Sequence, residues 1–145
     1  MDRQNSEILI IGAGMAGLSC ASALSKAGRD VRILDKGRGP GGRMAARRAE
    51  IGGELVSFDH GAQFFTARDA AFAEQVEKWH SAGIVARWPA ASDEAWIGTP
   101  GMNAPIREMA ESLNVHWGTR ALTICLLYTS PSPRDLSTSR MPSSA

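Results

Sequence analysis

The chain has 145 residues, of which 43% are hydrophobic and 21% are charged, a composition that suits one soluble globular domain. It excludes a collagen, a coiled coil and a disulfide scaffold. The formal net charge of +1 produces no global field that would draw the chain onto nucleic acid or an anionic membrane, so neither is an expected partner.

Two cysteines and one short apolar run indicate the cellular compartment in which the protein is expected. Cys20 and Cys125 are too few for a disulfide framework, which favours a reducing compartment. The uncharged run 8–24 is shorter than the roughly 20 apolar residues that span a bilayer, contains three glycines and follows no cluster of positive charge. The sequence therefore predicts a cytoplasmic protein without a targeting segment.

A dinucleotide-binding fingerprint stands near the start of the chain. The apolar run 7–11 (EILII) predicts a strand. Three glycines follow it in the spacing G-x-G-x-x-G: Gly12, Gly14 and Gly17. In this fingerprint the first glycine permits a tight turn, the second lets the backbone approach a pyrophosphate, and the third lets the helix pack closely on the strand. The free N–H groups near Met15 and Ala16 are then expected to face the phosphates.

The residues that follow complete a strand–helix–strand unit. Small and apolar residues at helical spacing predict a helix over 16–27 that stops at Gly28, and VRIL predicts a strand over 31–34. Asp35 ends this strand at close to the roughly 20-residue distance at which an acidic residue binds the ribose. Cys20 lies within the helix, where a small buried apolar side chain is expected.

The segment 37–48, GRGPGGRMAARR, indicates which dinucleotide is bound. Four glycines and Pro40 disfavour a helix and expose backbone N–H groups, while Arg43 supplies a fork of donors suited to a diphosphate. The segment resembles the GG-x-R loop of FAD-containing flavoproteins of the amine-oxidase type. Arg47 and Arg48 belong either to a solvated basic loop or to a surface that steers an anionic substrate.

A second motif narrows the resemblance. After a predicted hairpin or strand over 51–58, the chain reads FDHGAQFFTAR at 58–68, and D-x-G-A-Q-[FY] after a GG-x-R loop resembles the renalase-type flavoproteins. In that family this stretch lies against the flavin. The resemblance therefore implies that backbone and amide groups of Gly61, Ala62 and Gln63 contact the isoalloxazine or its linker.

The neighbouring polar and aromatic residues have less specific roles. Asp59 either orients the turn through nearby backbone N–H groups or contributes to the site. His60 is not expected to be catalytic, because hydride removal from an electron-rich heterocycle needs no strong base. Phe64 and Phe65 are expected to pack in the core, with the wall of a flat aromatic substrate as the alternative.

A helix and two short strands then indicate the start of a substrate domain. RDAAFAEQVEKWHSA predicts an amphipathic helix over 68–82, and its apolar stripe is expected to face the core: Phe72, Val76 and Trp79. The runs 84–88 and 95–98 predict short antiparallel strands. Two tryptophans in these strands are expected to be structural, with a substrate cavity as the alternative: Trp88 and Trp96.

The last motifs lie between residues 100 and 124. PGMNAPIREMAESL predicts a helix within 100–113, with Asn103 as its N-cap and Pro105 in its first turn, and P-G-M-N-A again resembles renalase-type sequences. VHWGTRALTI predicts a returning strand pair over 115–124, where the resemblance implies that the Ala121 backbone meets the adenine. Two histidines lack partners at metal-ligand spacing, so no metal site is expected: His80 and His116.

The segment 125–145 differs from everything before it. Its sequence, CLLYTSPSPRDLSTSRMPSSA, is rich in Ser, Thr and Pro and has no apolar period, so it cannot extend a packed core. Residues 125–135 fit one reading frame of a common transposase-type sequencing adapter, and 139–145 resemble the flow-cell primer that follows the index. We expect a non-native tail and a gene that continues past Ile124, with a genuine disordered tail as the alternative.

Together these motifs predict an α/β fold in which a Rossmann-like FAD-binding part covers 1–68. The start of an inserted α+β substrate domain, with return strands, covers 69–124, and the tail covers 125–145. FAD is the expected cofactor. The predicted cofactor-binding residues are Gly12, Gly14, Met15, Ala16, Gly17, Asp35, Lys36, Gly42, Arg43, Gly61, Ala62, Gln63 and Ala121.

The resemblance implies an oxidase that transfers a hydride from a reduced pyridine-nucleotide-like compound to flavin N5, with dioxygen as acceptor. An amine is the nearest alternative substrate. Because the cofactor carries such chemistry, the residues are expected to bind and orient rather than to act as acids or bases. Two further hypotheses stay open, a non-catalytic dinucleotide-binding module and an inactive truncated fragment, and the sequence leaves the oligomeric state undetermined.

Overall fold

A computed structural model describes residues 8–124 of the chain. The elements, in chain order, are β1 (Ile8–Ile11), α1 (Met15–Lys26), β2 (Val31–Leu34), the 3-10 turn η1 (Gly42–Met44), β3 (Ala46–Ile51), β4 (Glu54–Asp59), α2 (Ala70–Ser81), β5 (Val85–Arg87), β6 (Trp96–Gly98), α3 (Ala104–Glu111) and β7 (Val115–His116). The helices and strands predicted within 7–34 agree with α1, β1 and β2 to within a residue at each described end.

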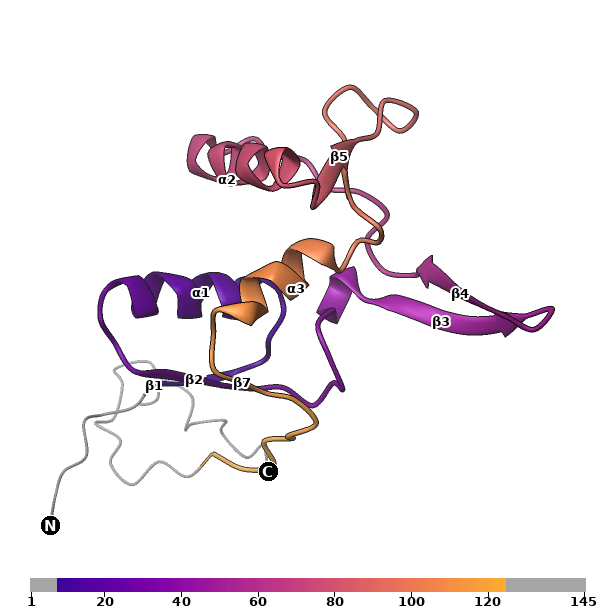
Figure 1. The fold of residues 1–145 in the computed structure, drawn as a ribbon. Coiled ribbons are helices and arrows are strands. Elements are labelled where there is room, and N and C mark those ends of the chain that lie inside the picture. Colours follow the sequence, from indigo (N-terminus) through magenta and orange to yellow (C-terminus); the bar gives the residue numbers. More distant parts are fainter. Residues whose placement is uncertain (1–7, 125–145) are drawn as a thin grey trace, which may run out of the picture.

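A three-stranded parallel sheet organises the dinucleotide-binding part. Its strand order is β1-β2-β7, with Ile8 opposite Val31 and Ile33 opposite Val115. The chain moves across the sheet in one direction, and the right-handed rule for crossovers then places both connecting helices on one face. Figure 1 shows α1 and α3 side by side above this sheet. The predicted Rossmann-like fold is confirmed.

The main core lies between this sheet and its two helices. Leu18 and Ala21 of α1, Ile33 of β2 and Ile106 of α3 are all fully buried in one cluster. Burying an apolar side chain of this size contributes about 1.5–3 kcal/mol. The contacts of these side chains therefore fix α1 and α3 against β2.

The side chains of β1 alternate between the two faces of the sheet. Ile8 and Ile10 pack against the core, whereas Leu9 and Ile11 remain 52% and 51% exposed on the opposite face. Alternation of this kind is the direct consequence of the two-residue period of a strand.

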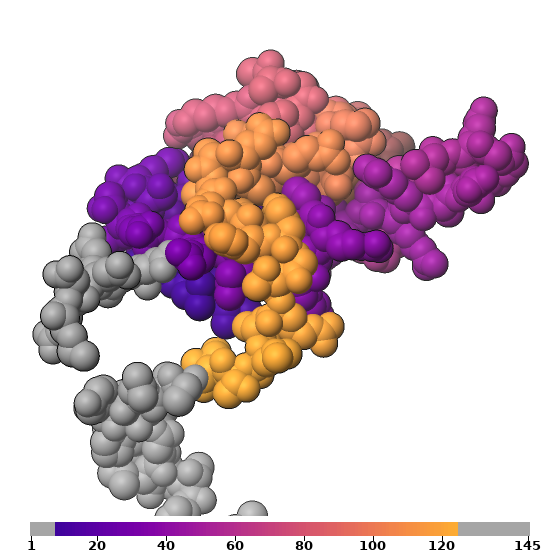
Figure 2. Space-filling view, turned by 60° about the horizontal axis from the view of Figure 1, so that its bottom comes forward, coloured from indigo at the N-terminus to yellow at the C-terminus, as the bar shows by residue number. Residues whose placement is uncertain are grey.

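An antiparallel hairpin, β3–β4, projects from the rest of the molecule (Figure 1, Figure 2). Its turn uses Gly52 and Gly53, both with positive φ (61° and 86°), as a two-residue hairpin loop prefers. The segment 37–48 was predicted as a loop throughout, and this is wrong at its end. Arg47 and Arg48 already pair with β4, so they are strand residues.

A second core cluster joins α2 to the small β5–β6 sheet. Val76 and Trp79 of α2 are buried against Val85 and Trp96, which confirms the predicted apolar stripe. The Trp79 indole Nε1–H also donates to a carboxylate oxygen of Glu108 in α3, at 2.9 Å. This bond, together with shared apolar contacts, connects the second cluster to the main core.

The ends of α2 follow from its side-chain chemistry. The Asp69 carboxylate accepts the N–H of Phe72 at 3.0 Å, so the helix begins after Asp69 and not at Arg68. On the exposed face, the Lys78 ammonium donates to Glu74 at 2.7 Å and holds the pKa of that carboxyl below its usual range.

One single-residue prediction is wrong, and another is confirmed in position but without the expected hydrogen bond. Cys20 is exposed rather than buried, because the buried face of α1 is formed by Leu18 and Ala21 and Cys20 lies off that face. Asn103 does occupy the N-cap position of α3, but its backbone is helical and its side chain makes no capping hydrogen bond.

The predicted strand pair over 115–124 is also wrong. Only the two residues of β7 form a strand, and they pair with β2. The chain then turns at Gly118 (φ 67°) and follows the loop after β2, because the N–H groups of Gly118 and Thr119 donate to the carbonyls of Gly37 and Asp35, at 2.7 and 2.8 Å.

The predicted tail, 125–145, lies outside the described residues, as does Cys125. Within 8–124, the structure contains no helix with the length and apolar character needed to cross a membrane.

Candidate dinucleotide-binding site

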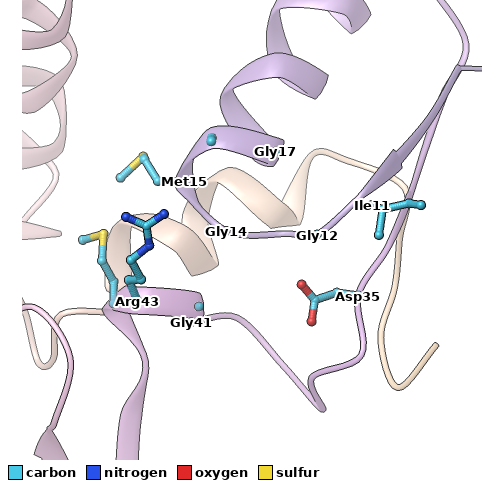
Figure 3. Close-up of a pocket in the computed structure, with 11 residues that line it drawn as sticks. Ile11, Gly12, Gly14, Met15, Gly17, Asp35, Gly41 and Arg43 are labelled. Carbon is cyan, nitrogen blue, oxygen red and sulfur yellow. The ribbon is translucent and has the colours of Figure 1, made fainter. Parts of the chain in front are cut away.

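A cavity of about 730 Å³ opens at the carboxyl ends of β1 and β2, between the first turn of α1 and η1 (Figure 3). Ligands of doubly wound α/β folds bind at this edge of the sheet. Eight of the predicted cofactor residues line it: Gly12, Gly14, Met15, Ala16, Gly17, Asp35, Gly42 and Arg43.

The three fingerprint glycines occupy three different environments. Gly12 has φ +103°, a conformation that L side chains rarely adopt. A Cβ added at Gly17 would overlap the carbonyl oxygen of Gly12, so this glycine is required for the close packing of α1 on β1. A Cβ at Gly14 would meet nothing within 4 Å, which leaves space for a ligand. These environments match the turn, packing and approach roles that the spacing predicts.

The first turn of α1 presents free hydrogen-bond donors to this cavity. Gly14 is the N-cap and has no side chain that could cap the helix. Within the described part of the chain, the N–H groups of Met15, Ala16 and Gly17 have no hydrogen-bond acceptor. Unpaired N–H groups at the positive end of a helix form a site for an anion such as a phosphate.

Asp35 holds the two loops of the site together. Its carboxylate accepts the N–H of Ala13 through Oδ2 and the N–H of Gly37 through Oδ1, each at 2.6 Å. Figure 3 shows the carboxylate facing the Gly12–Gly14 turn. Each carboxylate oxygen has two lone pairs, so each can still accept a hydroxyl group of a ligand.

Arg43 lies on the opposite wall of the cavity. Its guanidinium is exposed and points toward the first turn of α1, beside Met15 (Figure 3). Its backbone is held by the segment after β4, because the Ala62 N–H donates to the Arg43 carbonyl at 2.9 Å. A Cβ at Gly61 would overlap the same carbonyl. Gly61 and Ala62 therefore contact the arginine backbone, and with exposed Gln63 they lie outside the residues that line the cavity.

A second cavity, of about 400 Å³, continues along the end of β2. It adds two more of the predicted residues, Lys36 and Ala121, and shares five residues with the first cavity: Ile11, Gly12, Asp35, Gly41 and Gly42. The 13 predicted residues thus divide into ten that line the two adjoining cavities and three, at 61–63, that do not.

Several residues of these cavities were not predicted. Gly41 lies two positions before Arg43 and Met44 directly follows it, and the glycine pair 41–42 was the available signal for Gly41. Thr119 and Arg120 line the second cavity with Ala121. Their position depends on the backbone hydrogen bonds that direct the chain after β7, and no local sequence pattern predicts these hydrogen bonds.

The remaining residues that the sequence singled out have structural contacts. The Asp59 Oδ1 accepts the N–H of Met102 at 3.1 Å, a partner 43 positions away rather than in its own turn. Phe65 packs in the second cluster, whereas Phe64 is 42% exposed and meets Trp88 edge-on. The His80 Nδ1 lies 3.1 Å from the carbonyl oxygen of Val85.

The fold and the cavity at the strand ends define a Rossmann-like dinucleotide-binding domain. In agreement, residues 10–78 match the family described as "NAD(P)-binding Rossmann-like domain".

Two curated relatives add to this comparison. The chain is 36% identical over 118 residues to hydroxyneurosporene desaturase of Rubrivivax gelatinosus, an alignment that covers 73% of this chain and 21% of that protein. It is 45% identical over 40 residues to zeta-carotene-forming phytoene desaturase of Myxococcus xanthus, covering 28% of this chain and 8% of that protein. The chain therefore spans about a fifth of the length of the first relative and less than a tenth of the second. These similarities support a family of FAD-dependent, amine-oxidase-like oxidoreductases and do not single out the renalase type.

Proposed function

We propose that this chain is the dinucleotide-binding part of an FAD-dependent oxidoreductase. The observation that carries the proposal is the arrangement of Gly12, Gly14 and Gly17 opposite Arg43, with Asp35 at the end of β2, around one cavity. Each of these groups matches a part of a dinucleotide. The free N–H groups of α1 and the guanidinium suit the pyrophosphate, and the carboxylate suits a ribose.

The residues present fit FAD in particular. A nicotinamide-binding domain needs no arginine on a glycine-rich loop facing the first helix, whereas Arg43 gives the cavity a second group that can neutralise a diphosphate. The second cavity, with Lys36 and Ala121, extends along the sheet on the side where the adenosine would lie. When bound, FAD supplies a flavin ring that accepts a hydride. The task of this chain's own residues is to bind and orient the dinucleotide.

For the complete enzyme we propose the substrate that the resemblance to renalase-type sequences implies, a reduced pyridine-nucleotide-like compound, with dioxygen as acceptor. An amine is the alternative within the same reaction class. The names of the two desaturase relatives favour a second candidate, the desaturation of a long hydrocarbon chain. A screen of the complete enzyme with dihydronicotinamide isomers, amines and phytoene separates these three substrate classes. The readout is the loss of flavin absorbance as the flavin is reduced.

The cofactor proposal is tested first, by titrating the 145-residue chain with FAD and with NADH. We expect FAD to bind more tightly. Arg43→Ala should weaken FAD binding by about 1.5–3 kcal/mol, the scale of a lost charged hydrogen bond. Arg29→Ala is the matched control, because Arg29 is an exposed arginine outside both cavities. Equal FAD affinity of the two variants would refute the role of Arg43, and tighter binding of NADH would refute FAD as the cofactor.

A further inference from the structure

A separate groove, of about 650 Å³, lies on the other side of the glycine-rich loop. It shares no lining residue with the 730 Å³ cavity, and only Gly39 and Ala45 with the second one. Its lining includes four arginines and a histidine but no aspartate or glutamate: Arg38, Arg47, Arg48, Arg107 and His60. The groove is therefore strongly positive, although the whole chain has a net charge of only +1.

These side chains come from four segments of the chain that the fold holds in place. Arg38 follows Gly37, whose N–H and carbonyl are both hydrogen-bonded, to Asp35 and to Gly118. Arg47 and Arg48 belong to the six-residue pairing of β3 with β4, and His60 comes directly after β4. As neighbours in a strand, the two arginines point to opposite faces of the hairpin, so one of them at most directs its guanidinium into the groove. Arg107 lies in the first turn of α3, where its N–H donates to the carbonyl of Asn103 at 2.9 Å. Backbone positions around the groove are thus set before any ligand binds.

The groove arginines form no ion pair within the described part of the chain. Two exposed arginines elsewhere do have carboxylate partners, since Arg68 lies 3.6 Å from Glu94 and Arg87 lies 3.8 Å from Glu77. Within 8–124, none of the four groove arginines has a side-chain ion pair or hydrogen bond. Asp59 directly precedes His60, and its Oδ1 accepts the N–H of Met102; this carboxylate keeps its charge and offsets one of the positive charges near the groove.

We infer that this groove is an anion site that binds the phosphate group of a small ligand. Guanidinium groups present planar forks of donors that match phosphate oxygens, and several of them together concentrate multivalent anions. The volume also suits a small molecule rather than a bare ion. This site goes beyond the proposed cofactor function, because its side chains lie across the loop from the dinucleotide cavities.

The test is a titration of ¹⁵N-labelled 145-residue chain, followed by amide chemical shifts, with inorganic phosphate in one arm and ribose 5-phosphate in the other. Ionic strength is held constant with chloride. We expect saturable shifts at Arg38, His60 and Arg107. The Arg38→Gln, Arg107→Gln double variant should raise the Kd by about a hundredfold or more, because it removes two charged hydrogen bonds and each contributes about tenfold or more to affinity.

Arg29→Gln is the control and should leave the Kd unchanged. Arg107→Lys keeps the charge but removes the planar fork of donors, so its Kd should lie between those of the wild type and the double variant. Tighter binding of ribose 5-phosphate than of phosphate identifies an organic phosphate ester as the ligand, and equal binding identifies free phosphate. An unchanged Kd in the double variant, shifts confined to 12–17, or equal shifts with chloride alone would overturn the site. None of these outcomes depends on whether FAD binds, so the two proposals fail separately.

Discussion

Removal of the Asp35 carboxylate should destabilise the chain even in the absence of any ligand. Its two oxygens accept the N–H groups of Ala13 and Gly37 at 2.6 Å, so Asp35→Ala leaves two backbone donors without their acceptor. A hydrogen bond to a charged group contributes about 1.5–3 kcal/mol. Asp35 is only half-buried, so water replaces part of the loss, and we expect the free energy of unfolding to fall by about 2–4 kcal/mol in total.

The assay is urea denaturation of the 145-residue chain, followed by far-ultraviolet circular dichroism. Asp30→Ala is the matched control, because Asp30 precedes the other end of β2 and its side chain is exposed. An exposed change of this kind should alter stability by no more than about 0.5 kcal/mol. If the two variants unfold at the same urea concentration, the carboxylate does not hold the two loops together, and Asp35 would be a ligand-binding residue alone.

Three further substitutions test the core and the loop contacts, two by the same denaturation assay and one by amide hydrogen exchange. Gly17→Ala should lower the free energy of unfolding by about 1–3 kcal/mol, because the new Cβ overlaps the backbone of Gly12. Gly39→Ala is the control and should be tolerated, since its Cβ meets nothing within 4 Å. Equal effects of the two variants would contradict the close packing of α1. Ile106→Ala removes a fully buried side chain and should cost about 2–5 kcal/mol, and a loss below 1 kcal/mol would show that α3 is not packed as described. Asp59→Ala should make the amide of Met102 exchange faster with solvent, and unchanged exchange would rule out their hydrogen bond.

The local unit at the start of the chain was the most predictable part. The order of β1, α1 and β2 depends on near-neighbour patterns, namely an apolar run, glycine spacing and a stop at Gly28, and each of these acts within a few residues. Gly12, Gly14, Gly17 and Asp35 line the cavity for the same reason, because they stand at the junctions of these elements.

Contacts between distant segments were not predictable in this way. The partner of Asp59 is 43 positions along the chain, and the hydrogen bonds that direct 118–121 past β2 join backbone groups that carry no sequence signature. The groove arginines were noticed only in part. Arg47 and Arg48 were singled out, but Arg38 and Arg107 line the same groove because segments far apart in the sequence meet there.

The long insertion between the neighbouring strands β2 and β7 has a consequence for the order of folding. Ile8 pairs with Val31 across 23 positions, whereas Ile33 pairs with Val115 across 82. Closing the longer loop costs about 1 kcal/mol more entropy, a modest equilibrium penalty. Its kinetic effect is larger, because distant pairings form late and slow the folding rate. During synthesis the β1–α1–β2 unit can assemble first, and one edge of β2 stays open until the ribosome has produced β7.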